Sequence, residues 1–268
     1  MKPLITVPQS ESKGFFTVEP PSFRKQPYLK CLRCKRVSSS SAGNRPGTLA
    51  TPIARLARRR AGYPNDAMKI YTPPKIYTPK KWDLAGLHGI SDATLEMHFG
   101  LYEGYVKNTN LLNEQLSQIR EAGEGAGSDP GYAELVRRLG FEYNGMRLHE
   151  YYFDNMTANA KELRHGRLYS ALGECYGGFD EWKKDFVAVG GMRGIGWAIA
   201  YCDTVNGQIT NHWINDHENG HIAGFVPVVV LDVWEHAFIK DYKPAEKSKY
   251  IEAFFANLDW EACERRLP

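Results

Sequence analysis

Residues 230–238 read Val-Leu-Asp-Val-Trp-Glu-His-Ala-Phe and decide how the chain is interpreted. They place the carboxylate of Asp232 and the imidazole of His236 four residues apart, where an apolar strand ends and a turn or helix begins. Such a pair can hold one ion from a single local element, and carboxylate with imidazole suits iron, manganese or zinc. The alternative is an ordinary pair on a solvated helix, worth roughly a few tenths of a kcal/mol.

Two further histidines lie on the apolar stripes of predicted helices. The first helix opens at the N-cap Ser91 and carries His98 on its apolar face. The second opens at Asp129, followed by a proline, and carries His149. Its apolar stripe consists of Leu135, Val136, Leu139, Tyr143, Met146, Tyr152 and Phe153. Either histidine alone is a core residue with a hydrogen bond, but with Asp232 and His236 they complete the protein ligands of a redox metal with one open position.

At these residues the chain resembles the iron/manganese superoxide dismutase family. The family's Asp-x-Trp-Glu-His-Ala signature matches residues 232–237. Its first-helix pattern, His-x-Gly and then Tyr-Val, matches residues 98–100 and 105–106, and its second-helix pattern, Phe-x-x-Asn-Gly and then His, matches residues 141–145 and 149. Residues 194–197 and 257–260 follow in the family's order, and the resemblance covers residues 71–267.

The resemblance implies a dismutase that converts superoxide to oxygen and hydrogen peroxide at one iron or manganese ion per chain. The implied metal ligands are His98, His149, Asp232 and His236, with water or hydroxide in the fifth position. Tyr105 is the implied gateway phenol near this solvent. Trp234 is implied to help form an apolar wall that keeps the site dry.

Two departures from the family pattern concern the surroundings of the metal and the subunit interface. The second-helix position that often carries Gln is Gly145, and the corresponding loop position carries His217, which the resemblance places against the bound solvent. Because His occurs there in iron and manganese members alike, the metal stays open, with a preference for iron. Leu101 and Ile239 replace both ends of an inter-subunit His–Tyr bridge, and replacing both polar ends costs little.

The resemblance further implies a homodimer, with a tetramer as the alternative. Glu235 is expected to reach His236 of the partner subunit.

A rival motif is His217-Glu218-Asn219-Gly220-His221, which matches the H-E-x-x-H of zinc proteases. On a helix its two histidines would share one face and bind zinc. Asn219-Gly220 is a turn signal, and the surrounding run has no apolar stripe, so a loop is predicted instead. A non-haem iron oxygenase remains a further alternative by ligand type.

The two parts of the chain differ sharply in net charge. Residues 1–67 carry 13 Lys and Arg against 3 Asp and Glu, whereas residues 68–268 carry 21 against 28. The first segment is predicted to be a disordered basic leader, either an organelle transit peptide or upstream sequence before a start at Met68. We expect a cytoplasmic protein, or an organellar one if the leader is a transit peptide. The acidic remainder gives no support for nucleic-acid binding, and no apolar run is long enough for a membrane span.

The five cysteines form no disulfide framework. Cys31 and Cys34 lie in the leader, where a lone C-x-x-C does not make a zinc site. Cys175, Cys202 and Cys263 are expected to be buried or incidental thiols of a reducing compartment.

The predicted fold class is α+β. A helical hairpin domain (68–158), broken at the glycines of residues 123–127, is followed by an α/β domain (159–268) with a three-stranded antiparallel sheet. In the second domain we predict helices at 161–172, 180–189 and 248–257, and strands at 197–202, 208–214 and 226–231. Asn206-Gly207 predicts the hairpin turn between the first two strands.

Overall fold

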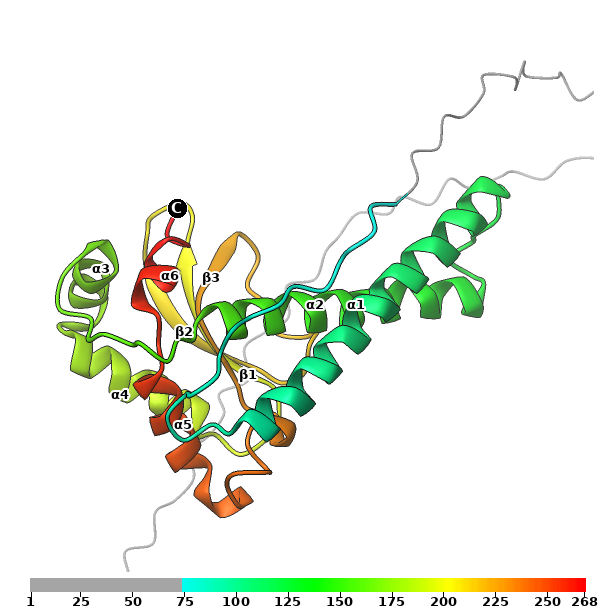
Figure 1. Ribbon diagram of the computed structural model, residues 1–268. Coiled ribbons are helices and arrows are strands. Elements are labelled where there is room, and N and C mark those ends of the chain that lie inside the picture. The colour runs from blue at the N-terminus through cyan, green and yellow to red at the C-terminus, as the bar shows by residue number, and fades with distance from the viewer. Residues whose placement is uncertain (1–73) are drawn as a thin grey trace, which may run out of the picture. The chain divides into compact units, whose positions relative to one another are not determined.

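The computed structural model describes residues 74–268. The predicted leader, with Cys31, Cys34 and the boundary at Met68, lies outside the described residues. In the described part, two long helices are followed by two shorter helices, three strands and the C-terminal helices (Figure 1). This order agrees with the predicted α+β class, while the domain division at 158/159 stays a prediction.

The helical hairpin is formed by α1 (Asp92–Glu121) and α2 (Pro130–Asp154), which pack side by side (Figure 1). The Ser91 side chain accepts a hydrogen bond from the Thr94 backbone N–H, and the Asp129 side chain accepts one from the Gly131 backbone N–H. Both predicted N-caps are therefore confirmed. The chain reverses between the helices at Gly123 and Gly125, whose φ angles of 72° and 101° favour glycine.

His98 and His149 are fully buried, as their positions on the apolar stripes predicted. The predicted apolar stripe of α2 was wrong in part, because Val136 and Tyr143 are 46% and 37% exposed. The buried residues of α2 begin at Glu142. Only the second half of this helix is enclosed, so the apolar stripe extends beyond the part of the helix that the core covers.

The next two helices are α3 (Arg167–Tyr176) and α4 (Phe179–Gly190). The helix predicted at 161–172 was placed too early. Gly166 has a φ of 111°, which is not helical, and α3 begins only after it. The prediction for α4 agrees with the structure to within one residue at either end.

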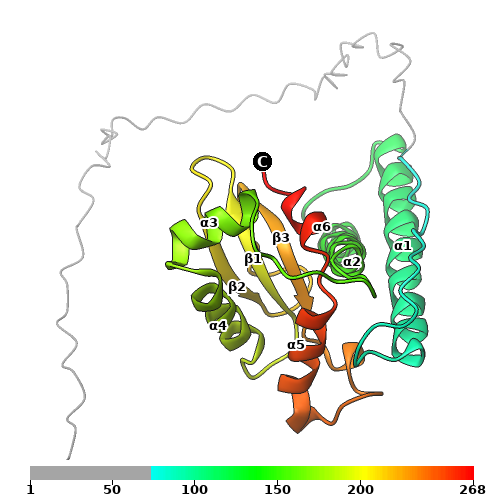
Figure 2. The same ribbon diagram turned by 60° about the vertical axis from the view of Figure 1, so that its left-hand side comes forward.

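The sheet consists of β1 (Trp197–Asp203), β2 (Ile209–Ile214) and β3 (Phe225–Asp232), in the order β2-β1-β3 and antiparallel throughout. Gly207, with a φ of 76°, lies in the turn between β1 and β2, as predicted. The sheet lies between α2 on one side and α3 and α4 on the other (Figure 2). Pairing of Trp197 with Asp232 fixes the end of β3, and the 3-10 helix η1 (Glu235–Ala237) follows within three residues.

The chain ends with the 3-10 helix η2 (Pro244–Glu246), α5 (Lys247–Ala256) and α6 (Trp260–Glu264). The predicted apolar face of α5 is largely confirmed, since Tyr250, Ile251 and Phe254 are buried. Helix α6 was not predicted, because its five residues are too few for a periodic pattern. No helix in the described part of the chain combines the length and apolar character that crossing a membrane requires.

Candidate metal centre

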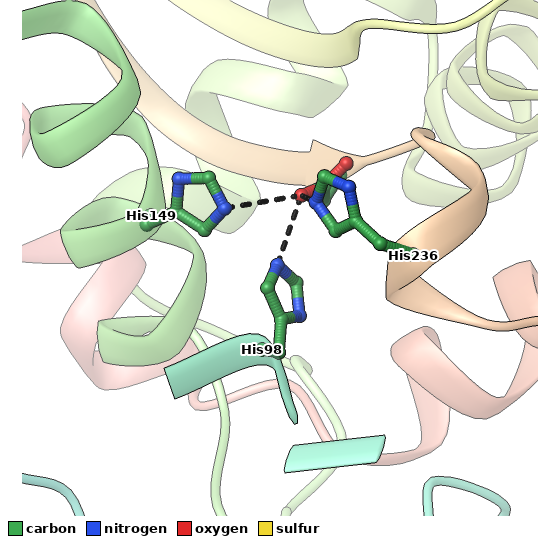
Figure 3. Close-up of side chains that lie close together, drawn as sticks. His98, His149 and His236 are labelled. Carbon is green, nitrogen blue, oxygen red and sulfur yellow. Dashed lines mark hydrogen bonds and ion pairs between the residues drawn. The ribbon is translucent and has the colours of Figure 1, made fainter. Parts of the chain in front are cut away.

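Four of the predicted site residues come together from four separate elements. His98 lies on α1, His149 on α2, Asp232 at the end of β3 and His236 in η1. Figure 3 shows the three imidazoles pointing toward one another from their different elements. Each of the four residues contributes one donor atom, and these four atoms all lie within 4.8 Å of one another.

The Oδ2 atom of Asp232 lies at the centre of this group. The Nε2 atoms of His98, His149 and His236 lie 3.1, 3.7 and 3.2 Å from it. Asp232, His98 and His149 are almost entirely buried, and the side chain of His236 is 19% exposed. The negative charge of a buried carboxylate must be compensated by a cation or by hydrogen bonds, and a metal ion is such a cation.

The hydrogen bonds of His149 fix which of its nitrogens is free. Its Nδ1 lies 2.6 Å from the carbonyl oxygen of Gly145, one turn earlier on α2, so Nδ1 carries the proton and donates it. The Nε2 lone pair then points into the group and has no hydrogen-bond partner among the described residues. Backbone orientation of a metal-binding histidine in this way is a common feature of metal sites.

Burial also keeps two of the imidazoles neutral. Desolvation is the main cause that lowers the pKa of His98, and that of His149 lies well below its usual value for the same reason. Only a neutral imidazole offers a lone pair to a metal. Burial alone would raise the pKa of Asp232, but the neighbouring His236 and His98 keep it below its usual value, so the carboxylate is ionised. Three imidazoles and one carboxylate fit a divalent or trivalent iron or manganese ion.

Two buried tyrosines hold the backbone of Asp232. The Tyr250 hydroxyl donates to the Asp232 carbonyl oxygen at 2.8 Å, and the Tyr152 hydroxyl lies 3.0 Å from that of Tyr250. Since the Tyr250 proton is used, Tyr152 donates in this pair. On the carboxylate, Oδ1 accepts from the backbone N–H of Trp234 at 2.8 Å, which leaves Oδ2 for the ion.

Tyr105 and His217 form a hydrogen-bonded pair beside the four residues. Trp197 donates its indole N–H to Nδ1 of His217 at 3.0 Å. An indole nitrogen can only donate, so Nδ1 of His217 is an acceptor and Nε2 carries the proton. His217 therefore donates to the Tyr105 oxygen, 2.8 Å away, and the Tyr105 hydroxyl keeps its own proton for another acceptor. Burial lowers the pKa of His217 to about 4, which keeps this ring neutral at pH 7.

Aromatic rings enclose the site. The ring of Trp234 stacks on His217 and His236, with centroids 5.0 and 5.9 Å apart. Phe153 lies against His98 at 5.0 Å, and Trp197 lies edge-on to His149 at 5.1 Å. These contacts put Trp234 where the predicted apolar wall requires it. Its role in excluding water stays a prediction.

The residues expected at a subunit interface lie on the surface. Glu235 is exposed, and Leu101 and Ile239 are 38% and 44% exposed. They lie on α1 and beside η1, which pack against each other. Both positions of the missing inter-subunit bridge are thus accessible apolar side chains.

The zinc-protease alternative does not fit the structure. Residues 215–220 form a loop, as the Asn219-Gly220 turn signal predicted, and Gly220 has a φ of 102°. Because no helix forms here, His217 and His221 do not share a helix face. Both ring nitrogens of His221 are instead used in bonds to Tyr201 and to the His217 carbonyl. Nothing found favours the oxygenase alternative either.

Three residues of the site were not predicted as parts of it: Trp197, Tyr250 and Tyr152. Trp197 follows the Gly-x-Gly stretch that belonged to the family pattern, so its position was visible but its contact with His217 was not. Tyr152 lies three residues after His149, on the same face of α2. That spacing could have indicated that Tyr152 lies close to the site.

Comparison with known proteins gives a consistent result. The family model described as iron/manganese superoxide dismutases, C-terminal domain, matches residues 164–266. The chain is 34% identical over 184 residues to superoxide dismutase [Mn] 2 of Haloferax volcanii, covering 68% of this chain and 89% of the relative. It is 33% identical over 183 residues to superoxide dismutase [Fe] of Aquifex pyrophilus, covering 67% and 85%. The iron superoxide dismutase of Saccharolobus solfataricus is 31% identical over 182 residues, covering 66% and 85%. With these matches and this four-residue centre, the chain belongs to the iron/manganese superoxide dismutase family.

Proposed function

We propose that this protein is a superoxide dismutase that holds one iron or manganese ion through His98, His149, Asp232 and His236. The observation that carries the proposal is the convergence of their four donor atoms within 4.8 Å, in a member of this family. An iron or manganese ion held there would supply one-electron redox chemistry, by which one superoxide is oxidised to oxygen and another is reduced to hydrogen peroxide.

The residues around the ion have to manage protons, because peroxide formation consumes two of them. The Tyr105 hydroxyl is suited to hold a proton at the site. Burial raises its pKa to about 12, so it stays protonated at neutral pH. His217 donates to the Tyr105 oxygen and so leaves the phenolic proton free to turn toward the substrate. We propose proton delivery through Tyr105 and His217.

The donor set suits iron and manganese alike, and the relatives carry both names. Of the two, we propose iron as the resident metal. Reconstitution of the metal-free protein with each metal separately tests this choice, and a higher specific activity of the manganese form would reverse it.

The proposed assembly is a homodimer. Exposed Glu235, next to His236, and the accessible side chains of Leu101 and Ile239 support it. Sedimentation analysis of the wild type and of Glu235→Ala tests the assembly. A dimer that weakens in the variant is expected, a tetramer would be the alternative assembly, and a monomeric wild type would exclude both.

For location we propose the cytoplasm, with import into an organelle as the alternative if residues 1–67 act as a transit peptide. The three cysteines in the described part of the chain are free thiols, which fits a reducing compartment. Fluorescent fusions of the full chain and of a chain starting at Met68 would separate the two locations.

The decisive test combines metal analysis with two activity assays on the purified protein. About one iron or manganese per chain together with superoxide dismutation is expected. Stoichiometric zinc with peptide cleavage and no dismutation would overturn the proposal in favour of the H-E-x-x-H alternative.

A further inference from the structure

His221, the second histidine of the H-E-x-x-H sequence, has no part in the four-residue centre, yet both of its ring nitrogens are engaged. Nδ1 lies 2.7 Å from the Tyr201 hydroxyl, and Nε2 lies 2.8 Å from the carbonyl oxygen of His217. A carbonyl oxygen can only accept, so Nε2 carries the proton and donates it. Nδ1 is then the acceptor, and Tyr201 donates to it.

These bonds tie the loop that carries His217 to the sheet. Tyr201 lies on β1 and is 2% exposed, so its hydroxyl is a fixed anchor. Gly220, with a φ of 102°, turns the chain so that His221 folds back over the backbone of His217. A loop held by such partly buried hydrogen bonds keeps its side chains in a narrower set of positions than a solvated loop does.

The other side of the same loop is closed by Asp216. Its Oδ1 accepts from the backbone N–H groups of Glu218 and Asn219 at 2.7 and 2.9 Å, and its Oδ2 accepts from the Asn219 side chain at 2.9 Å. Asp216 shapes the turn locally but does not reach the sheet. Among the described residues, two side-chain hydrogen bonds join this loop to β1: Trp197 bonds the ring of His217, and Tyr201 bonds the ring of His221. Of the two, the bond from Tyr201 reaches the end of the loop, where His221 in turn holds the His217 backbone.

The position of His217 matters because each of its two ring nitrogens makes a hydrogen bond. Nδ1 accepts from Trp197 at 3.0 Å and Nε2–H donates to Tyr105 at 2.8 Å. The Trp197 bond selects the tautomer that donates to Tyr105. A displacement of the His217 backbone would lengthen both bonds, and hydrogen bonds weaken steeply with poor geometry.

We propose that His221 is a positioning residue: through its bond to the His217 carbonyl it fixes the imidazole of His217 against Tyr105. The proposal rests on the proposed function, because it assigns the effect to proton delivery through Tyr105 and His217. His221 touches neither the substrate nor the metal ligands. The H-E-x-x-H sequence thus serves as an active histidine followed by the histidine that holds its loop.

The test compares three variants of the metal-loaded enzyme. His221→Phe keeps a ring but removes both hydrogen bonds, and kcat is expected to fall about tenfold, since displacements of about 1 Å can cost roughly a hundredfold. His221→Gln retains an N–H that can reach the His217 carbonyl and is expected to recover most of the activity. The matched control is His212→Phe on β2, whose ring lies near the same Tyr201, with centroids 5.7 Å apart, but does not contact the loop. It is expected to behave like the wild type.

A double variant separates positioning from a general loss of structure. If His221 acts through His217, then His221→Phe adds nothing to the loss of kcat already caused by His217→Ala. An undiminished tenfold loss in the His217→Ala background would overturn the proposal. So would a His221→Phe enzyme with unchanged kcat, or one that no longer retains its metal.

Hydrogen–deuterium exchange across residues 215–222 gives a readout that does not depend on activity. Faster exchange is expected in His221→Phe than in the wild type, His221→Gln or His212→Phe, and equal exchange in all four would overturn the loop contact. If His221→Phe does not fold, Tyr201→Phe removes the anchor instead and should increase exchange in the same loop. A wild-type enzyme without dismutation would contradict the proposed function, while exchange would still decide whether His221 holds the loop.

Discussion

The ring of Tyr105 occupies the space that a side chain at Gly145 would need. A Cβ atom at Gly145 would lie 2.6 Å from the Tyr105 ring, far inside normal contact distance. Gly145 also supplies the carbonyl that orients His149. The glycine, the tyrosine and the histidine ligand therefore form one packed unit, and the loop residue His217 completes it from the other side.

Gly145→Ala is expected to destabilise the protein by about 1–3 kcal/mol and to lower kcat, because the added methyl group displaces the Tyr105 ring. Chemical unfolding and a dismutation assay measure the two effects. The control is Gly173→Ala in α3, where an added Cβ meets nothing within 4 Å. That variant should stabilise the protein by roughly 0.5–1 kcal/mol at unchanged activity. Equal effects at both glycines would contradict the packing of Tyr105 on Gly145.

Two alanine variants distinguish the metal ligand His149 from the neighbouring residue His217. His149→Ala should abolish metal retention, since one of the four protein ligands is lost. His217→Ala should retain the metal and lower kcat, because it removes the hydrogen bonds to Tyr105 and Trp197 but none of the four ligands. Metal content after gel filtration, measured together with activity, decides between them. Metal loss in His217→Ala with retention in His149→Ala would reverse the assignment.

The stability of the protein should depend on pH through His217. Its pKa is about 4 in the folded protein, mainly through burial, against 6.5 for a free histidine. The unfolded chain therefore takes up a proton first as the pH falls. The stabilisation is complete above about pH 6.5 and is lost as the pH falls toward 4. Relative to His217→Gln, the wild type should lose about 2 kcal/mol of unfolding free energy between pH 7 and pH 5. Denaturant unfolding of both proteins at the two pH values measures this difference, and parallel behaviour would contradict it.

Arg138 is expected to assist the approach of superoxide, which is an anion. Its guanidinium lies 4.4 Å above the Phe141 ring, which in turn lies 4.6 Å from the ring of His217. The buried Glu142 holds it through a 2.7 Å bond to Nε, and its side chain remains 51% exposed. Arg138→Gln should lower kcat/KM about two- to fivefold at low ionic strength, and the difference should shrink as salt is added.

The neighbouring Arg137 provides the control for this experiment. It pairs with Glu134 on the exposed surface of α2, and its side chain is 63% exposed. Arg137→Gln removes the same charge from the same helix and should leave kcat/KM nearly unchanged. Equal losses in both variants would indicate a general effect of net charge instead of a local one at Arg138.

The start of the folded chain can be found by truncation. The indole N–H of Trp82 donates to Asp154 at 2.6 Å, and the Tyr77 backbone exchanges two hydrogen bonds of 2.8 Å with the Asn110 side chain. A chain starting at Met68 keeps these contacts and should match the full chain within about 0.5 kcal/mol of stability. A chain starting at Leu84 loses them and should melt at a clearly lower temperature. A large loss already at Met68 would show that residues 1–67 pack on the folded part.

Local signals in the sequence were sufficient for most of the secondary structure. The N-caps at Ser91 and Asp129, the glycines after α1 and the Asn206-Gly207 turn act within a few residues, so they could be recognised without the fold. Where the local signal was weak, the prediction was wrong: α3 begins only after Gly166, and α6 is too short to show a period.

The sequence alone also determined which residues could hold a metal, because the order and spacing of His98, His149, Asp232 and His236 match a family pattern. Only the tertiary structure decided that their donor atoms meet, since His98 and Asp232 are 134 positions apart and are brought together by the packing of the hairpin on the sheet. The same holds for the proton on each imidazole. The sequence does not say which of the two ring nitrogens of a histidine carries the proton. Only the neighbours in space determine it, such as the Trp197 indole for His217 and the His217 carbonyl for His221.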